Sequence, residues 1–248
     1  MKVSWLVLTY NRDTKVDKAI RHNIENAGSD WHEMVWVDNG SSDGVRDVMS
    51  SFKPKTSILF DENKGVAIGY NTAMVNARGD YLCITGCDML MPKDWLKTFK
   101  EYFEKVDKTG IAAMYSGPLS WVPERIRGDE ATIEGMRIRP AMPIGRRMYS
   151  RELLGRIGYL REDFGLYGWE DVEWGFRAER VCRELGLLTY VIPDQIAQHL
   201  GTEGIHTFDG KDESAYHAFK AEEVKCKTKL QLMEWCRAND YPYYNPYR

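Results

Sequence analysis

The segment Gly79-Asp80-Tyr81-Leu82-Cys83-Ile84-Thr85-Gly86-Cys87-Asp88-Met89-Leu90-Met91-Pro92 indicates how the whole chain is organised. Its apolar, β-branched and aromatic run from Tyr81 to Thr85 predicts a short buried strand. The small residues that follow place Asp88 at the carboxyl end of this strand. In an open α/β sheet, ligands collect at that edge.

Asp88 has two interpretations at this point. A carboxylate beyond a strand suits a hard divalent cation, which prefers oxygen ligands. A lone aspartate in this position also forms an Asx turn or a helix cap. Pro92 stands where a helix can begin without losing a hydrogen bond, so we expect a helix from Pro92 to about Val106.

Length and composition exclude several classes of protein. The 248 residues, with a net charge of −3, suffice for one large domain or a domain with a small annex. No apolar run approaches the roughly 20 residues that span a bilayer, and a strand begins too early for a signal peptide. Five cysteines without a Cys-x-x-Cys pair argue against disulfides and a zinc site. We therefore expect a soluble, cytoplasmic protein.

Strands and helices alternate along the first half of the chain. We expect strands at Val3–Thr9, Met34–Val37, Ser57–Phe60, Tyr81–Thr85 and Ile111–Tyr115, with helices at Thr14–Asn26 and Val66–Ala77. This alternation predicts right-handed βαβ units, and hence an α/β fold with a mostly parallel central sheet flanked by helices. The first half could also be a dinucleotide-binding domain, but Thr9-Tyr10-Asn11-Arg12 argues against it, because it offers no glycine for a pyrophosphate.

The pattern breaks from Ser116 to about Ile144, which is rich in Gly, Pro and Arg and predicts a long irregular loop. Between Arg125 and Arg156 there are many arginines and few acids. This local excess is either a solvated surface with a few ion pairs or a surface for an acidic or phosphate-bearing partner. The sequence leaves both interpretations open.

The second half carries a pair of adjacent carboxylates. We expect a strand at Arg146–Tyr149 and a helix at Glu152–Ile157, followed by a loop rich in glycine and aromatic residues. That loop delivers Glu170 and Asp171 to the first turn of a helix that ends near Leu185, where a carboxylate is also a favourable cap. A strand at Leu187–Ile192 precedes His199, and a helix from Glu213 to Arg237 precedes the end.

These segments resemble the GT-A fold of family 2 glycosyltransferases over residues 3–201. The elements that stand in the family's order are Thr9-Tyr10-Asn11-Arg12, Val37-Asp38-Asn39-Gly40-Ser41-Ser42-Asp43-Gly44, Asn63-Lys64-Gly65 with Asn71, the strand to Asp88, Gly168-Trp169-Glu170-Asp171, and His199. Each is weak alone, but together and in order they favour the ligand interpretation of Asp88.

The resemblance implies a site for a nucleotide-diphosphate sugar, most often a UDP-sugar. Asp38 would accept a hydrogen bond from the base, and Lys64, Gly65 and Asn71 would lie near the ribose and diphosphate. The residues implied in nucleotide binding are Thr9, Tyr10, Asn11, Arg12, Asp38, Asn39, Ser41, Asn63, Lys64, Gly65, Asn71 and Cys87.

The resemblance also implies a metal site for Mn²⁺ or Mg²⁺. Asp88 matches the last aspartate of the family's Asp-x-Asp motif, although Gly86 stands where the first aspartate usually is. His199 matches a histidine that completes this site in several members, with His206 as a second candidate. A packed or surface imidazole is the alternative interpretation of His199.

For catalysis, the resemblance makes Asp171 the base and lets Glu170 position the acceptor or the donor sugar. Tyr167 and Trp169 suit either stacking on a sugar or packing in the core. An inverting transfer needs a carboxylate to accept the proton of the acceptor hydroxyl, and a metal to stabilise the departing diphosphate. We therefore expect a metal-dependent, inverting glycosyltransferase.

The expected acceptor is a saccharide or glycolipid. The arginine-rich segment, including Arg146 and Arg147, leaves room for an acidic acceptor, including a modified nucleic-acid base, which the net charge of −3 opposes. A non-catalytic sugar-nucleotide or glycan-binding protein is the main rival, because Gly86 breaks the motif. A nucleotidyltransferase is opposed by the lack of a glycine-rich loop after the first strand.

The predicted domain covers residues 1–205, with a donor-binding half at 1–115 and an acceptor half at 116–205. A helical extension over 206–248 is expected to pack on it. The donor sugar and the oligomeric state are left open by the sequence.

Overall fold

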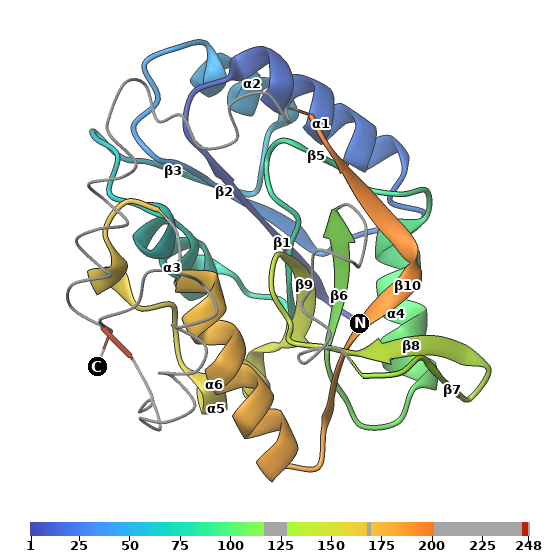
Figure 1. The fold of residues 1–248 in the computed structure, drawn as a ribbon. Coiled ribbons are helices and arrows are strands. Elements are labelled where there is room, and N and C mark those ends of the chain that lie inside the picture. The colour runs from blue at the N-terminus through green and yellow to red at the C-terminus, as the bar shows by residue number, and fades with distance from the viewer. Residues whose placement is uncertain (117–127, 168–169, 201–244, 248) are drawn as a thin grey trace.

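A computed structural model describes residues 1–116, 128–167, 170–200 and 245–247 (Figure 1). Trp169, His206 and the predicted extension over 206–248 lie outside, or almost wholly outside, these residues. Among the helices that the structure describes, none is long and apolar enough to cross a membrane.

One twisted sheet forms the centre of the molecule (Figure 1). Its order is β3 (Thr56–Leu59), β2 (Glu33–Asp38), β1 (Val3–Thr9), β4 (Tyr81–Ile84), β9 (Arg146–Ser150), β6 (Thr109–Ser116), β10 (Leu188–His199), β8 (Met136–Pro140) and β7 (Ala131–Ile133). The first four are mutually parallel, whereas β9 runs antiparallel to both β4 and β6. The predicted α/β class with a mostly parallel sheet is confirmed for the first half.

Helices cover both faces of this sheet. One face packs against α1 (Asp13–Glu25), α2 (Val45–Phe52) and α4 (Trp95–Lys105). The other face packs against α3 (Val66–Asn76), α5 (Arg151–Ile157) and α6 (Glu170–Glu184), which Figure 1 shows grouped together. A single turn of 3₁₀-helix, η3 (Glu162–Phe164), precedes α6.

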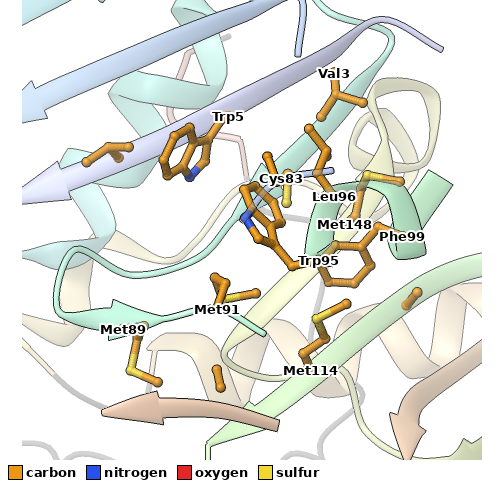
Figure 2. Close-up of a cluster of buried hydrophobic side chains, with 14 of the residues drawn as sticks. Val3, Trp5, Cys83, Met89, Met91, Trp95, Leu96, Phe99, Met114 and Met148 are labelled. Atoms are coloured by element: carbon orange, nitrogen blue, oxygen red, sulfur yellow. The ribbon is translucent and has the colours of Figure 1, made fainter. Parts of the chain in front are cut away.

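Strand β1 explains why both faces are covered. Its side chains alternate between the two cores, so that Trp5 and Val7 join the α1–α4 side while Leu6 and Leu8 join the α3–α6 side. Figure 2 shows Trp5 beside Trp95 of α4, with ring centroids 5.5 Å apart. The indole N–H of Trp5 donates to the Thr85 hydroxyl at 2.9 Å, which removes the cost of burying it.

Several elements differ from the sequence predictions. Helix α2 was not predicted, because its eight residues follow a run of turn formers that hides its start. Helix α4 begins at Trp95 rather than at Pro92, with Asp94 in the left-handed conformation before it. Strand β10 continues to His199, seven residues beyond the predicted end, with a register shift between Val191 and Ile196.

The arginine-rich segment contains a hairpin where an irregular loop was predicted. Strands β7 and β8 are joined by Glu134 and Gly135, both with positive φ, as a two-residue hairpin turn requires. Arg137 pairs with Glu130 at 2.6 Å and with Asp194 at 2.5 Å. In this hairpin, the interpretation as a surface with ion pairs is therefore correct.

Candidate active site

A cavity of about 290 Å³ opens where β1, β2 and β4 end. Its lining comes from three strand ends, helix α3, the loop before α6 and the end of β10. The lining residues are Leu8, Thr9, Tyr10, Asn11, Arg12, Asn39, Asn63, Val66, Tyr70, Gly86, Cys87, Asp88, Leu166, Tyr167 and His199. The tertiary structure thus brings together most of the predicted nucleotide and metal residues.

The loop after β1 is tied to the loop after β2. Asn11 and Arg12 both have a left-handed backbone, with φ of 55° and 69°. Asn11 donates its N–H to the Ser41 hydroxyl at 2.8 Å and accepts from the Ser42 N–H at 2.9 Å. These contacts hold the sharp turn that directs Tyr10 and Arg12 into the cavity lining. Ser41 therefore stabilises the loop after β1 without itself lining the cavity.

Asp38, which the sequence predicts to contact the nucleotide base, has its carboxylate directed into the protein. Its carboxylate is fully buried and accepts hydrogen bonds from Arg46 Nε at 2.9 Å and from the Ser41 hydroxyl. Arg46 also donates to the Phe60 carbonyl at 2.7 Å. Both carboxylate oxygens therefore face the protein, and the neighbouring Asn39, not Asp38, lines the cavity.

Asn39 and Asn63, which both line the cavity, belong to one hydrogen-bond network. Asn39 Nδ2 donates to Asn63 Oδ1 at 2.8 Å, while Asn39 Oδ1 accepts from the Lys64 N–H at 2.9 Å. Gly65 follows with a φ of 97°, and a Cβ there would lie 2.5 Å from the carbonyl oxygen of Gly165. Glycine is therefore required where this loop meets the loop before α6. The Lys64 ammonium lies 5.0 Å from the Phe60 ring centroid instead of lining the cavity.

Asn71 is also placed differently from its prediction. The side chain is fully buried and donates to the Leu160 carbonyl at 2.8 Å and to Glu162 Oε1 at 2.9 Å. It also accepts from the Leu160 N–H at 2.9 Å. Asn71 thus positions the segment that precedes α6 and is not part of the cavity lining.

Asp88 and His199 face each other at the cavity. Strand β5 (Met89–Leu90) pairs with the end of β10, which places His199 Nε2 3.4 Å from Asp88 Oδ2. Arg12 approaches the same oxygen at 3.5 Å. A carboxylate and an imidazole that share one accessible space are a suitable pair of donors for Mn²⁺ or Mg²⁺. Among the described residues there is no cluster of three such side chains.

The turn before Asp88 explains the missing first aspartate of the motif. Gly86 has a φ of 83°, and a Cβ there would lie 2.9 Å from Cγ of Met89. Any side chain at this position would therefore be strained and would collide with a buried neighbour. Cys87 lines the cavity, but burial raises the pKa of its thiol, so that it stays protonated.

Glu170 and Asp171, the carboxylate pair at the start of α6, differ in how deeply they are buried. Glu170 is 5% exposed, whereas Asp171 is only half-buried. Helix α6 is anchored by Arg177, which pairs with Glu173 and donates to the carbonyls of Ile157 and Tyr159 at 2.7 Å each. This anchor was not predicted, because an i, i+4 pair alone does not reveal burial.

The two arginines that begin β9 have different surroundings. Arg147 is 3% exposed, and its guanidinium carbon lies 4.4 Å from the Trp174 ring centroid. It therefore belongs to the core, and its predicted contact with an acceptor is not supported by this position. Arg146 is half-buried and donates from Nε to the Met114 carbonyl at 3.1 Å.

Solved structures with this fold bind nucleotide sugars. A mannosyltransferase from Pyrobaculum calidifontis, in complex with GDP-Man and Mn²⁺, superposes with a TM-score of 0.64 at 22% identity, covering 99% of this chain and 66% of that chain. S. aureus TarS in complex with UDP-GlcNAc superposes with a TM-score of 0.63 at 18% identity, covering 90% and 66% respectively. These similarities show the GT-A fold that the sequence predicted.

Several sequence relatives are named as glycosyltransferases. An uncharacterized glycosyltransferase of Bacillus subtilis (strain 168), YfnE, is 34% identical over 118 residues, which is 46% of this chain and 30% of the relative. The chain spans less than half of the length of the curated relatives that it matches. A family model described as glycosyl transferase family 2 matches residues 4–158, which is more than half of the chain. The chain therefore belongs to glycosyl transferase family 2.

Proposed function

We propose that this chain is a metal-dependent, inverting glycosyltransferase that uses a nucleotide-diphosphate sugar, with UDP as the favoured nucleotide. The observation that carries the proposal is the cavity in which three strand ends meet the Asp88–His199 pair. Residues 1–115 would supply most of the donor site, and residues 116–205 the acceptor side. A cytoplasmic location remains a prediction.

Cavity residues offer suitable groups for the nucleotide. The Tyr10 ring and the amide groups of Asn39 and Asn63 line its wall and suit a base or a ribose. Arg12 carries a cation near Asp88, where a diphosphate would bind. The fold neighbours with UDP-GlcNAc and with GDP-Man support a nucleotide-diphosphate donor, while the choice of uracil comes from the family resemblance.

Asp88 and His199 would hold the divalent metal, with diphosphate and water oxygens as the remaining ligands. The Mn²⁺ in the mannosyltransferase complex supports this assignment. When bound, the metal would stabilise negative charge on the departing diphosphate. Arg12 would contribute a second positive charge to the same group.

Asp171 would act as the general base. Its carboxylate would take the proton of the acceptor hydroxyl as that oxygen forms a bond to the anomeric carbon and the bond to the diphosphate breaks. Attack from the face opposite the nucleotide inverts the configuration at that carbon. Glu170, buried at the adjacent position, would position the donor sugar or the acceptor.

A non-catalytic sugar-nucleotide or glycan-binding protein is the second candidate, favoured by Gly86 in place of an aspartate. Either a saccharide or a glycolipid remains a suitable acceptor for the enzyme. Asp171, half-buried in the first turn of α6, favours catalysis, because a binding module has no need of an accessible carboxylate base.

Thermal stabilisation by nucleotides tests the donor site first. UDP, GDP, CDP and TDP would each be added with Mn²⁺ and with a chelator. A ligand that binds only the folded state raises its stability by mass action, by about 2.7 kcal/mol at a hundred times Kd. We expect UDP to stabilise the protein only with metal. No shift with any nucleotide would contradict the proposal.

A further inference from the structure

Arg146 lies at the same edge of the sheet as the cavity. Strand β9 runs antiparallel to β4 and β6, so that its first residue stands where those strands end. Arg146 pairs with Met114 near the end of β6, and its neighbour Arg147 pairs with Ile84, the last residue of β4. A single antiparallel strand therefore brings a cation to the edge that carries Asp88.

Arg12, Arg146 and Arg147 all lie at this edge, and they differ in their partners. Arg12 pairs with Asp88 at 3.5 Å, and Arg147 is buried against Trp174. Arg146 donates to the Met114 carbonyl at 3.1 Å and contacts the sulfur of Met89 at 4.0 Å. Within the described residues, no carboxylate lies within the 4.0 Å of an ion pair with Arg146.

Arg146 therefore has hydrogen-bonding capacity to spare. A guanidinium carries five N–H donors, of which one meets the Met114 carbonyl and one points to a weak sulfur acceptor. Burial lowers the pKa of Arg146, while the carboxylates of Asp171 and Asp88 act in the opposite direction. None of its nitrogens is among the buried, unpartnered side-chain atoms of the described residues, so the unused N–H groups reach open space in which an anion can meet them.

The position of Arg146 favours the acceptor side of the site. Arg146 is absent from the lining of the donor cavity. Its strand neighbour Arg147 packs on Trp174 of α6, the helix that begins with Glu170 and Asp171. An anion bound by Arg146 would thus lie on the side of helix α6 and not within the donor cavity.

We infer that Arg146 binds a carboxylate or phosphate group of the acceptor sugar and so holds its hydroxyl beside Asp171. This inference rests on the proposed function and narrows its acceptor to an anionic saccharide. A planar guanidinium suits both groups, because its parallel N–H bonds match two oxygens of a carboxylate or a phosphate. A hydrogen bond between charged groups contributes roughly 1.5–3 kcal/mol, which corresponds to about 10- to 100-fold in affinity.

Matched pairs of small sugars test this inference. Binding of methyl glucuronide and methyl glucoside, and of glucose phosphate and glucose, would be measured by ligand-observed NMR on the whole chain with UDP and Mg²⁺. We expect the anionic member of at least one pair to bind about 10-fold more tightly or better. The pair that shows the preference distinguishes a carboxylate from a phosphate.

Substitutions then assign the preference to one side chain. Arg146→Gln should reduce the preference to near unity, and Arg146→Lys, which keeps the charge, should retain part of it. Arg137→Gln, on the ion-paired hairpin, is the matched control and should leave it unchanged. Equal affinities within both pairs, or a preference that survives in Arg146→Gln, would overturn the inference.

Nucleotide stabilisation separates this inference from the proposed function. Thermal shifts with UDP and metal would be recorded on the same samples. If the wild type shows no such shift, the donor site fails, whatever the sugars do. If Arg146→Gln keeps the shift and loses the anion preference, the variant is folded and Arg146 acts on the acceptor side.

Discussion

The two sides of the candidate site are built differently. On the donor side, polar residues hold one another in place, as in the contacts of Asn11 with Ser41 and of Asn39 with Asn63. On the acceptor side, Arg146 and Asp171 interact only at longer range, and within the described residues neither side chain forms an ion pair. Under the proposed function, this difference predicts a donor site that is formed in advance and an acceptor site that is completed by its ligand.

The largest effect is expected on the acceptor side, from Asp171→Asn. Removal of a general base should lower the transfer rate by about 10²- to 10⁴-fold, measured with a UDP-sugar and a saturating acceptor. Stabilisation by UDP and metal should stay the same, because the donor side is intact. Glu184→Gln, at the exposed end of the same helix, is the control. Retained turnover in Asp171→Asn would move the base to Glu170 or elsewhere.

A second substitution removes the proposed metal ligand of the donor side, Asp88. Asp88→Ala should remove the metal-dependent part of the UDP stabilisation, about 2.7 kcal/mol at a hundred times Kd, because His199 alone offers a single donor. Thermal shifts with Mn²⁺ and with a chelator measure it. Asp107→Ala, at an exposed position, should behave as the wild type. An unchanged metal requirement would rule out Asp88 as a ligand.

Asp38→Asn tests whether the buried hydrogen bonds of Asp38 stabilise the donor side. The variant leaves Arg46 and Ser41 without a charged acceptor, so the free energy of unfolding should fall by roughly 1–3 kcal/mol in urea titrations. Asp17→Asn, which breaks a surface pair with the exposed Arg21, should cost less than about 1 kcal/mol. Full stability together with lost UDP binding would instead restore the predicted contact of Asp38 with the base.

The smallest effect is expected from Glu33, at the opposite end of β2 from the site. Burial alone would raise the pKa of Glu33, but hydrogen bonds from the Ser4 hydroxyl and from the Arg78 and Gly79 amides outweigh it and lower the pKa. The contribution of the Glu33 carboxylate to the free energy of unfolding is thus complete above the ordinary carboxyl pKa. It is lost as the pH falls through the lower pKa of the folded state.

Glu33→Gln measures that contribution. The variant should be less stable than the wild type by about 1 kcal/mol at neutral pH, and the difference should shrink in acid, as followed by urea unfolding at several pH values. UDP binding should not change, since Glu33 lies far from the cavity along the strand. A difference between the two proteins that is independent of pH would show that the Glu33 charge has no role.

Regular patterns in the sequence predicted the donor half well. Strands β1, β2 and β4 are apolar runs that end in polar residues, so both their existence and their carboxyl-end site followed from local sequence. The hairpin β7–β8 was missed because its strands are short and their pairing is marked only by positive φ at Glu134 and Gly135. The full length of β10 was missed because its second part contains Pro193 and polar residues, and pairing to β5 and β6 decides it.

Residue types and spacing by themselves determined the fold class, the order of the elements and the set of polar groups that meet at one edge. Tertiary structure alone decided which of these groups face the cavity. Asn71 is turned inward by Leu160 and Glu162, which are distant in sequence. Asp38 is turned inward by Ser41 and by Arg46, which is itself held by the Phe60 carbonyl, while Asn39 and Tyr70 line the wall. The physical reason is that burial depends on contacts between segments far apart in the chain, whereas strand and helix patterns are local.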